Sequence, residues 1–148
     1  SQSQLKFQNQ LSLQANQSCF FATIGYASRL KGKETPSVSD FVKQDFVLVT
    51  GIANPSDLIQ HLDSLGATYT HLSFSDHHHF SSKDVHHILK TAGQKPILTT
   101  EKDFVRLQPR LNKFAIYYLP IKIAILKSQE NFFKEYIVNE IENFSTKN

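Results

Sequence analysis

Residues 46–66 read FVLVTGIANPSDLIQHLDSLG. The run opens with four consecutive apolar residues, which is typical of a strand that is buried on both faces of a sheet. After Gly51, leucine and isoleucine recur three or four positions apart from Pro55 onward, as on one face of an amphipathic helix. Gly66 is of the residue type that most often ends a helix. The stretch therefore predicts a buried strand, a tight turn and a helix.

The same alternation of strand and helix continues toward the C-terminus. Thr68–Phe74 alternates with period 2 and predicts a second strand, and Pro96–Thr99 predicts a third. The remaining predicted elements are helices from Ser81 or Ser82 to Gly93, over Thr100–Leu107 and over Gln129–Phe144, and strands over Lys113–Leu119 and Lys122–Leu126. This order predicts an α/β fold, a Rossmann-like three-layer domain with a mostly parallel sheet, over residues 45–148.

The first 44 residues have a different character. Residues 5–13 alternate loosely between apolar and polar types, Cys19–Tyr26 has the composition of a strand, and residues 28–40 are polar and rich in turn-forming types. We expect residues 1–44 to form an extended, β-ribbon-like lead-in between domains. The chain begins at Ser1 and contains no methionine, so we also expect it to be part of a longer polypeptide.

The composition excludes several classes of protein. Of the 148 residues, 40% are hydrophobic and 20% are charged, which excludes a disordered chain. No apolar run approaches the roughly 18 residues that a membrane-spanning helix needs. The net charge is +3, but the basic residues are scattered and no nucleic-acid-binding motif is present, so we expect no nucleic-acid partner. A single cysteine, Cys19, excludes an internal disulfide and a cysteine-rich zinc site.

Three polar loops follow three of the predicted strands, at Gly51–Pro55, Ser75–Phe80 and Thr99–Asp103. Right-handed crossovers bring the carboxyl ends of parallel strands to one edge of the sheet, where ligands bind. In the second loop Asp76 precedes His77. Such a carboxylate orients the imidazole of a general base and stabilises its charged form, and both groups are also common metal ligands. The histidines that follow are interpreted as polar surface residues: His78, His79, His86 and His87.

The first loop has a structural and a functional interpretation. In the structural one, Asn54 caps the following helix and Pro55 takes its first position. In the functional one, Gly51 allows close backbone approach, and the free N–H groups at the start of the helix hold an anion.

The third loop is partly explained by capping. Thr100 and Asp103 have the spacing of a capping box at the start of the next helix. Capping explains neither Lys102 nor Arg106, for which solvated surface charges are the simpler interpretation.

The three segments 46–55, 71–80 and 97–107 together resemble the C-terminal half of the tetraacyldisaccharide 4'-kinases, the lipid A 4'-kinases, in order and spacing. The resemblance covers about residues 20–123. It implies a kinase that transfers the γ-phosphate of ATP to the 4'-hydroxyl of a tetraacyl disaccharide 1-phosphate, a lipid A precursor. It implies this reaction at the cytoplasmic face of a Gram-negative inner membrane, with peripheral membrane contact through the full-length protein.

The resemblance also implies which parts of the protein carry the activity. ATP and Mg²⁺ are expected to be bound mainly by an N-terminal P-loop domain that is absent from this chain, so we expect the chain alone to be inactive. The catalytic pair is expected to be Asp76 and His77, and no residue of this chain is expected to bind a metal. The residues expected to contact the substrate or the other domain are Gly51, Asn54, Thr99, Thr100, Glu101, Lys102, Asp103 and Arg106.

Two alternatives remain open from the residues themselves. Asp76-His77-His78 spells the signature of a metal-dependent phosphoesterase of the Asp-His-His type. Such an enzyme needs further aspartates on earlier strands, and the preceding strand offers only Asp45, at its wrong end. The second alternative is a non-catalytic α/β interaction domain, in which the loops are ordinary caps and turns.

Overall fold

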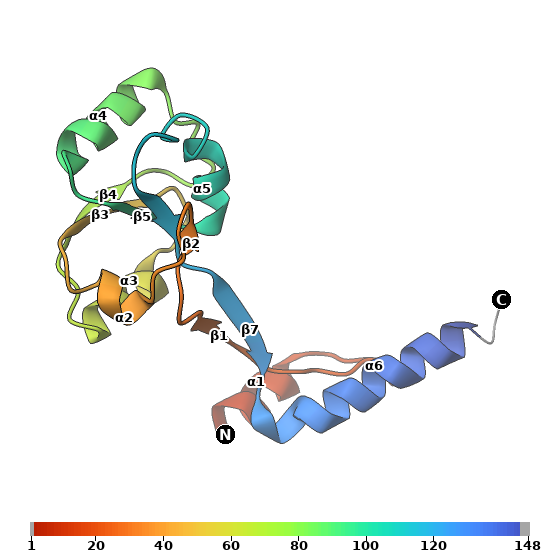
Figure 1. Ribbon diagram of the computed structural model, residues 1–148. Helices are drawn as coiled ribbons and strands as arrows, with labels where there is room; N and C mark the ends of the chain where they lie inside the picture. The colour runs from red at the N-terminus through yellow and green to blue at the C-terminus, as the bar shows by residue number, and fades with distance from the viewer. Residues whose placement is uncertain (1, 146–148) are drawn as a thin grey trace. The chain divides into compact units, whose positions relative to one another are not determined.

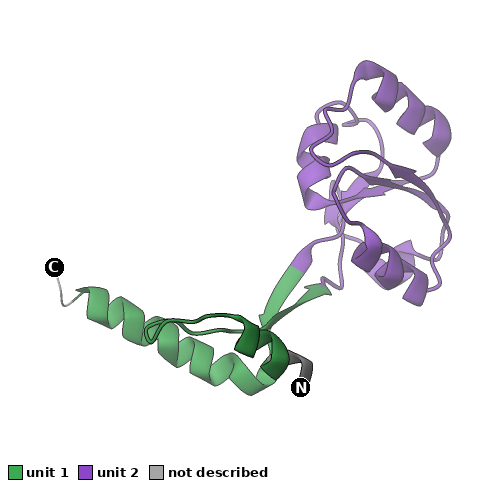
Figure 2. Ribbon diagram, turned by 180° about the vertical axis from the view of Figure 1, so that it is seen from behind, with its two compact units in different colours: residues 1–25, 122–148 green, residues 26–121 purple. Residues whose placement is uncertain are grey.

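A computed structural model describes residues 2–145, and the chain divides into two compact units (Figure 2). Residues 26–121 form unit 2, and the segments on either side of it, up to residue 25 and from residue 122 on, form unit 1. This division differs from the expected boundary after residue 44. Residues 26–44 join unit 2 because Leu30, Val38 and Phe41 are buried in its core.

Unit 2 contains a five-stranded sheet with the order β2-β6-β5-β3-β4 (Figure 1). The strands are β2 (Lys31–Gly32), β3 (Phe46–Thr50), β4 (Tyr69–Ser73), β5 (Ile97–Thr99) and β6 (Ile116–Tyr118). Four of them run parallel, with Val47 opposite Thr70 of β4 and Ile97 of β5. The edge strand β2 is antiparallel to β6. The expectation of a mostly parallel sheet is confirmed.

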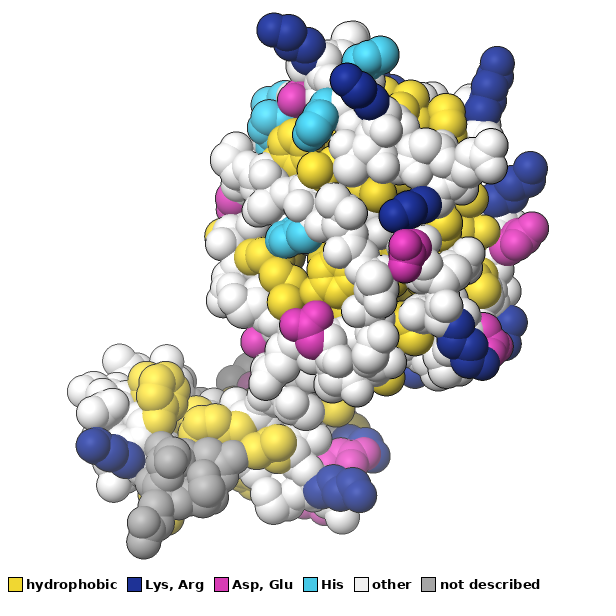
Figure 3. Space-filling model, turned by 90° about the vertical axis from the view of Figure 1, so that its left-hand side faces the viewer, with side chains coloured by type: hydrophobic (Ala, Val, Ile, Leu, Met, Phe, Trp, Pro, Cys, Tyr) yellow, Lys and Arg dark blue, Asp and Glu magenta, His cyan; other side chains and the backbone are white. Residues whose placement is uncertain are grey.

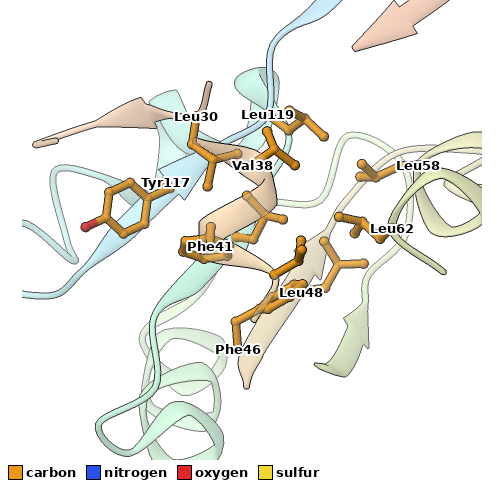
Figure 4. Close-up of a cluster of buried hydrophobic side chains, with 11 residues drawn as sticks. Leu30, Val38, Phe41, Phe46, Leu48, Leu58, Leu62, Tyr117 and Leu119 are labelled. Carbon is orange, nitrogen blue, oxygen red and sulfur yellow. The ribbon is translucent and has the colours of Figure 1, made fainter. Parts of the chain in front are cut away.

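Helices cover both faces of this sheet, so the expected three layers are also confirmed (Figure 1). On one face lie α2 (Val38–Phe41) and α3 (Ser56–Ser64), and on the other lie α4 (Ser82–Ala92) and α5 (Glu101–Leu107). All residues of β3 are buried, and they alternate between the two faces. Phe46 and Leu48 pack with Leu58 and Leu62 of α3 (Figure 4). Burying one such side chain contributes roughly 1.5–3 kcal/mol.

The opposite core joins β3 to α4 and α5. Val47 and Val49 pack with Ile88 of α4, Ile97 and Leu107, all of which are buried. Because both faces are covered, the strand reads as a continuous apolar run rather than as an alternating one.

Local hydrogen bonds determine the residues at which the helices of unit 2 begin. Ser81 is the N-cap of α4, and its side chain and that of Asp84 form a capping box. The helix α3 begins one residue later than expected. Pro55 is its N-cap residue and accepts the first helical hydrogen bond from the Ile59 N–H at 3.0 Å. Asn54 Oδ1 accepts a hydrogen bond from the Ser56 N–H at 3.0 Å, so Asn54 supports the turn before the helix.

Unit 1 is built from both ends of the described chain. Its elements are α1 (Gln2–Gln10), most of β1 (Ala22–Tyr26) and β7 (Ile121–Ile125), a 3-10 turn at Lys127–Gln129 and α6 (Glu130–Ser145). The expected extended conformation of the first residues is wrong, because α1 is a helix. Glutamine-rich sequence favours a helix over a strand, and a helix pairs its own backbone groups without a neighbouring strand.

The terminal helix α6 has nearly the expected bounds, but its apolar stripe is not a core. The rings of Phe133 and Tyr136 pack on Phe20, with centroids 5.0 and 5.5 Å away. No described residue of α6 is buried, and Phe144 is 71% exposed. Further exposed apolar residues of α6 are Phe132, Ile137, Val138 and Ile141. Among the described residues, no helix is long and apolar enough to span a membrane.

Candidate active site

The carboxyl ends of β3, β4 and β5 lie at one edge of the sheet, since these strands are parallel neighbours. Two hydrogen bonds join the loops that follow them. The Gly51 N–H donates to Asp103 Oδ2 at 2.7 Å, and Lys102 Nζ donates to Asp76 Oδ1 at 2.7 Å. The structure therefore brings together the three loops that the sequence predicted to meet.

Asp76 lies between two partners. Its Oδ1 accepts hydrogen bonds from Lys102 Nζ at 2.7 Å and from the His77 N–H at 2.9 Å, and its Oδ2 lies 3.5 Å from His77 Nε2. The hydrogen bond from Lys102 is the largest of the effects that hold the pKa of Asp76 below its usual range. The carboxylate is thus ionised at neutral pH and can orient the imidazole and stabilise its protonated form.

His77 is both exposed and held in an unusual backbone conformation. Its side chain is 75% exposed, so a ligand can reach the ring. Its φ is 56°, and among residues 2–145 no other non-glycine residue has a positive φ. Such a conformation costs on the order of 1–3 kcal/mol and clusters at functional sites. Here the turn is supported by the Asp76 carboxylate and by a hydrogen bond from the His78 N–H to the Ser75 carbonyl at 3.2 Å.

His78 is not the polar surface residue that we expected. Its ring packs against Phe74 and Phe80, with centroids 4.8 and 5.2 Å away, and its Nε2 lies 3.0 Å from Asp84 Oδ2. Hydrogen bonds from the Ser81 hydroxyl and N–H, and then from His78, lower the pKa of Asp84 to about 2. The flanking phenylalanines were the sequence signal for this packing. The other three histidines of this region are exposed, as expected: His79, His86 and His87. Figure 3 shows histidine side chains gathered near basic and acidic groups.

The packing of His78 does not support the phosphoesterase alternative. His78 pairs with Asp84, whereas His77 pairs with Asp76, so the three residues of Asp76-His77-His78 do not converge on one point. Within the part of the chain that the structure describes, no three His, Cys, Asp or Glu side chains are grouped so that they could hold a metal ion.

Asp103 is fully buried and joins two loops. Its Oδ2 accepts from the Gly51 N–H at 2.7 Å and from Thr100 Oγ1 at 2.8 Å. Its buried Oδ1 has no hydrogen-bond partner among the described residues. A Cβ at Gly51 would lie 3.0 Å from this oxygen, so any larger residue there would make the buried carboxyl shift by a few tenths of an ångström. The Asp103 carboxylate is thus enclosed by its own loops, and its hydrogen bonds give it a structural role between Gly51 and Thr100.

Of the other predicted site residues, Thr99 and Thr100 make hydrogen bonds within the fold, and Glu101 lies on the surface. Thr99 is buried, and its Oγ1 donates to the Val49 carbonyl at 2.7 Å. Thr100 is the N-cap of α5, as expected. Glu101 is exposed. Burial of the Tyr118 ring, and then the negative charge of Glu101, raise the pKa of the Tyr118 hydroxyl.

Two arginines fasten the loop that carries His77. Arg106 Nη1 donates to the His78 carbonyl at 3.4 Å. Arg110, which sequence reasoning missed, donates through Nη1 to the Phe80 carbonyl and through Nη2 to Ser82 Oγ at 2.9 Å. The sequence signal for it is a basic residue at every fourth position, Lys102, Arg106 and Arg110, although Arg110 itself lies in the turn after α5.

The pH dependence of stability can be predicted from His71, which lies beside the site. Its Nε2 is 2.9 Å from Thr50 Oγ1, and burial lowers its pKa from the ordinary 6.5. Protons therefore bind more readily to the unfolded state. We expect the free energy of unfolding to fall as the pH drops below about 6.5, because the unfolded state then gains protons that the folded state does not bind. The fall ends below the pKa of His71 in the folded state, and its size is about 1.4 kcal/mol for each unit by which burial lowers that pKa.

Urea unfolding at pH 7.5 and pH 5 measures this effect. His71→Gln, which removes the titrating ring, should reduce the difference between the two pH values, whereas the exposed His87→Gln should leave it unchanged. An equal difference in all three proteins would contradict the assignment to His71.

Comparison with known proteins gives concordant matches. Residues 2–142 match the profile of the family described as Tetraacyldisaccharide-1-P 4'-kinase. A tetraacyldisaccharide 4'-kinase of Flavobacterium johnsoniae is 36% identical over 130 residues, which are 87% of this chain and 38% of the relative. The corresponding enzyme of Bacteroides thetaiotaomicron is 40% identical over 114 residues, which are 70% of this chain and 30% of that relative. The chain thus spans well under half the length of these relatives.

A solved structure shares the fold. The crystal structure of LpxK from Aquifex aeolicus, in complex with ATP, aligns with a TM-score of 0.59 at 18% identity, over 87% of this chain and 38% of that one. The profile match and the identity to the curated relatives agree with the resemblance of the three strand-end loops. The chain belongs to the tetraacyldisaccharide-1-P 4'-kinase family.

Proposed function

We propose that this chain is part of an ATP-dependent kinase that phosphorylates the 4'-hydroxyl of a tetraacyl disaccharide 1-phosphate in lipid A synthesis. The observation that carries the proposal is the arrangement of Asp76, which lies between Lys102 and an exposed His77 at the carboxyl edge of the sheet. Family membership supports the reaction, and the geometry supports these residues as its acceptor-side groups.

The chemistry that we propose for this chain is proton removal from the acceptor. The neutral His77 imidazole takes the proton of the acceptor hydroxyl as that oxygen bonds to the γ-phosphorus of ATP, while the bond from this phosphorus to the bridging oxygen breaks and ADP leaves. The ionised Asp76 carboxylate orients the ring and stabilises the imidazolium that results. Phosphoryl transfer depends mostly on positioning and charge stabilisation, so a group held this way has a defined part in it.

The described residues do not fit a site for Mg²⁺–ATP. They contain no grouped metal ligands, and the nearest approach to a P-loop, at Gly32-Lys33, has Glu34 where the motif needs serine or threonine. We therefore assign ATP and Mg²⁺ to the part of the family's polypeptide that this chain does not span. From the family's place in lipid A synthesis, we also propose that the reaction takes place at the cytoplasmic face of the inner membrane.

The exposed apolar side chains of unit 1 indicate that another part of the polypeptide packs against this unit. A helix that carries Phe132, Ile141 and Phe144 on its surface gains little by folding alone. We propose that a P-loop domain of the same polypeptide covers these side chains and that the protein acts only as the complete pair of domains.

The first test compares this chain with the full-length polypeptide that carries it. Transfer of labelled phosphate from ATP to tetraacyl disaccharide 1-phosphate is measured for both. We expect transfer by the full-length protein and none above background by residues 1–148, because the donor-side groups are missing. Transfer by residues 1–148 would contradict the division of labour, and a folded full-length protein without transfer would contradict the proposed reaction.

A further inference from the structure

Three cations recur every four residues along α5 and the turn that follows it: Lys102, Arg106 and Arg110. Each reaches the loop between β4 and α4. Lys102 donates to the Asp76 carboxylate at 2.7 Å and Arg106 to the His78 carbonyl at 3.4 Å. Arg110 donates to the Phe80 carbonyl. One face of this segment therefore holds the loop through three side-chain hydrogen bonds.

The acceptors follow the same order as the donors. They belong to residues 76, 78 and 80 of the loop, in the order of Lys102, Arg106 and Arg110. His77 lies between the first two contacts, and its ring is exposed.

A neighbouring face of the same segment, about 100° round the helix axis from the cations, is anchored in the core. Asp103, Leu107 and Leu111 also recur every four residues, and all are fully buried. Asp103 adds the hydrogen bond to the Gly51 N–H. This anchoring fixes the rotation of α5 about its axis, so the direction in which the cations point is set by the core rather than by solvent.

We propose that Lys102, Arg106 and Arg110 are positioning residues for the Asp76–His77 pair, acting through the loop and not by contact with the substrate. The positioning role rests on the proposed function of His77, whereas the contacts of the three cations with the loop are independent of that function. Lys102 holds the carboxylate that faces the ring, and the two arginines hold the backbone on the far side of His77.

A double-mutant cycle in the full-length polypeptide tests this mode of action. Lys102→Ala should lower kcat about 10–100-fold with little change in KM, since small misplacement of a reacting group has effects of this size. Lys102→Arg should recover most of the loss. In an Asp76→Asn background, Lys102→Ala should have no further effect. Multiplication of the two losses would mean that Lys102 acts directly on a ligand and would overturn the proposal.

Hydrogen exchange in the same polypeptide supplies a readout that is independent of activity. Arg106→Ala and Lys102→Ala should speed exchange of the His77 and His78 amides several-fold, while Lys113→Ala, which removes an exposed lysine after α5, should not. Unchanged exchange would overturn the positioning role. If exchange responds but His77→Ala leaves turnover intact, the proposed function fails and the fastening of the loop stands.

Discussion

Replacing His77 by alanine in the full-length polypeptide is expected to lower kcat by about 10²–10⁴-fold, the usual contribution of a positioned general base. The physical reason is the loss of the imidazole that receives the acceptor proton, while Asp76 and Lys102 keep their ion pair. KM for the disaccharide should change less than kcat, since binding groups elsewhere are untouched. Steady-state kinetics with saturating ATP measure both constants.

The backbone of His77 calls for a second variant. Asparagine tolerates a positive φ far better than alanine, so His77→Asn keeps the turn while removing the base. We expect His77→Asn to lose as much turnover as His77→Ala. The exposed His87→Ala serves as the matched control and should keep its turnover. Near-normal turnover of His77→Asn would remove His77 from the chemistry and leave it a role in loop shape alone.

Replacing Asp103 by alanine is expected to lower the free energy of unfolding by about 2–4 kcal/mol. Asp103 is fully buried and accepts hydrogen bonds from Gly51 and Thr100. Without it, the Gly51 N–H loses its hydrogen-bond acceptor in the interior, and α5 loses part of its N-terminal hydrogen bonding. Urea unfolding followed by circular dichroism measures the change.

Two further variants show how much of the lost unfolding free energy comes from the buried hydrogen bonds and how much from removal of a negative charge. Asp103→Asn keeps an oxygen for the Gly51 N–H and should lose less stability than Asp103→Ala. Asp57→Ala removes an exposed carboxylate from the first turn of α3 and should lose only about 0.5 kcal/mol through the helix dipole. Equal losses for Asp103→Ala and Asp57→Ala would contradict a structural role for the buried carboxylate.

Much of unit 2 could be predicted from local pattern. The apolar run at Phe46–Thr50 and the helical spacing after it depend on neighbours within a few residues, and these choose strand or helix directly. The edge strand β2 could not be predicted this way. It has two residues, and its place depends on pairing with β6, more than eighty residues later. Such pairing leaves little trace in a two-residue stretch.

The candidate site was predicted in its location and only partly in its roles. Strand order sufficed to bring Asp76, Lys102 and Gly51 to one edge. Burial then distinguished neighbours of similar polarity, because Asp103 lies in the core while Lys102 reaches the surface. The packing of His78 and the reach of Arg110 depend on side chains from separate elements, whose meeting no local spacing describes.

The sequence by itself determined the order of strands and helices from β3 onward, the edge at which the polar loops meet and the family, because each of these depends on residue types and their spacing along the chain. Only the tertiary structure decided which carboxylate is buried, which histidine is exposed and which apolar stripe lacks a cover. The stripe of α6 shows the reason: its spacing predicts a helix with an apolar side, but burial is a property of the atoms that pack against that side.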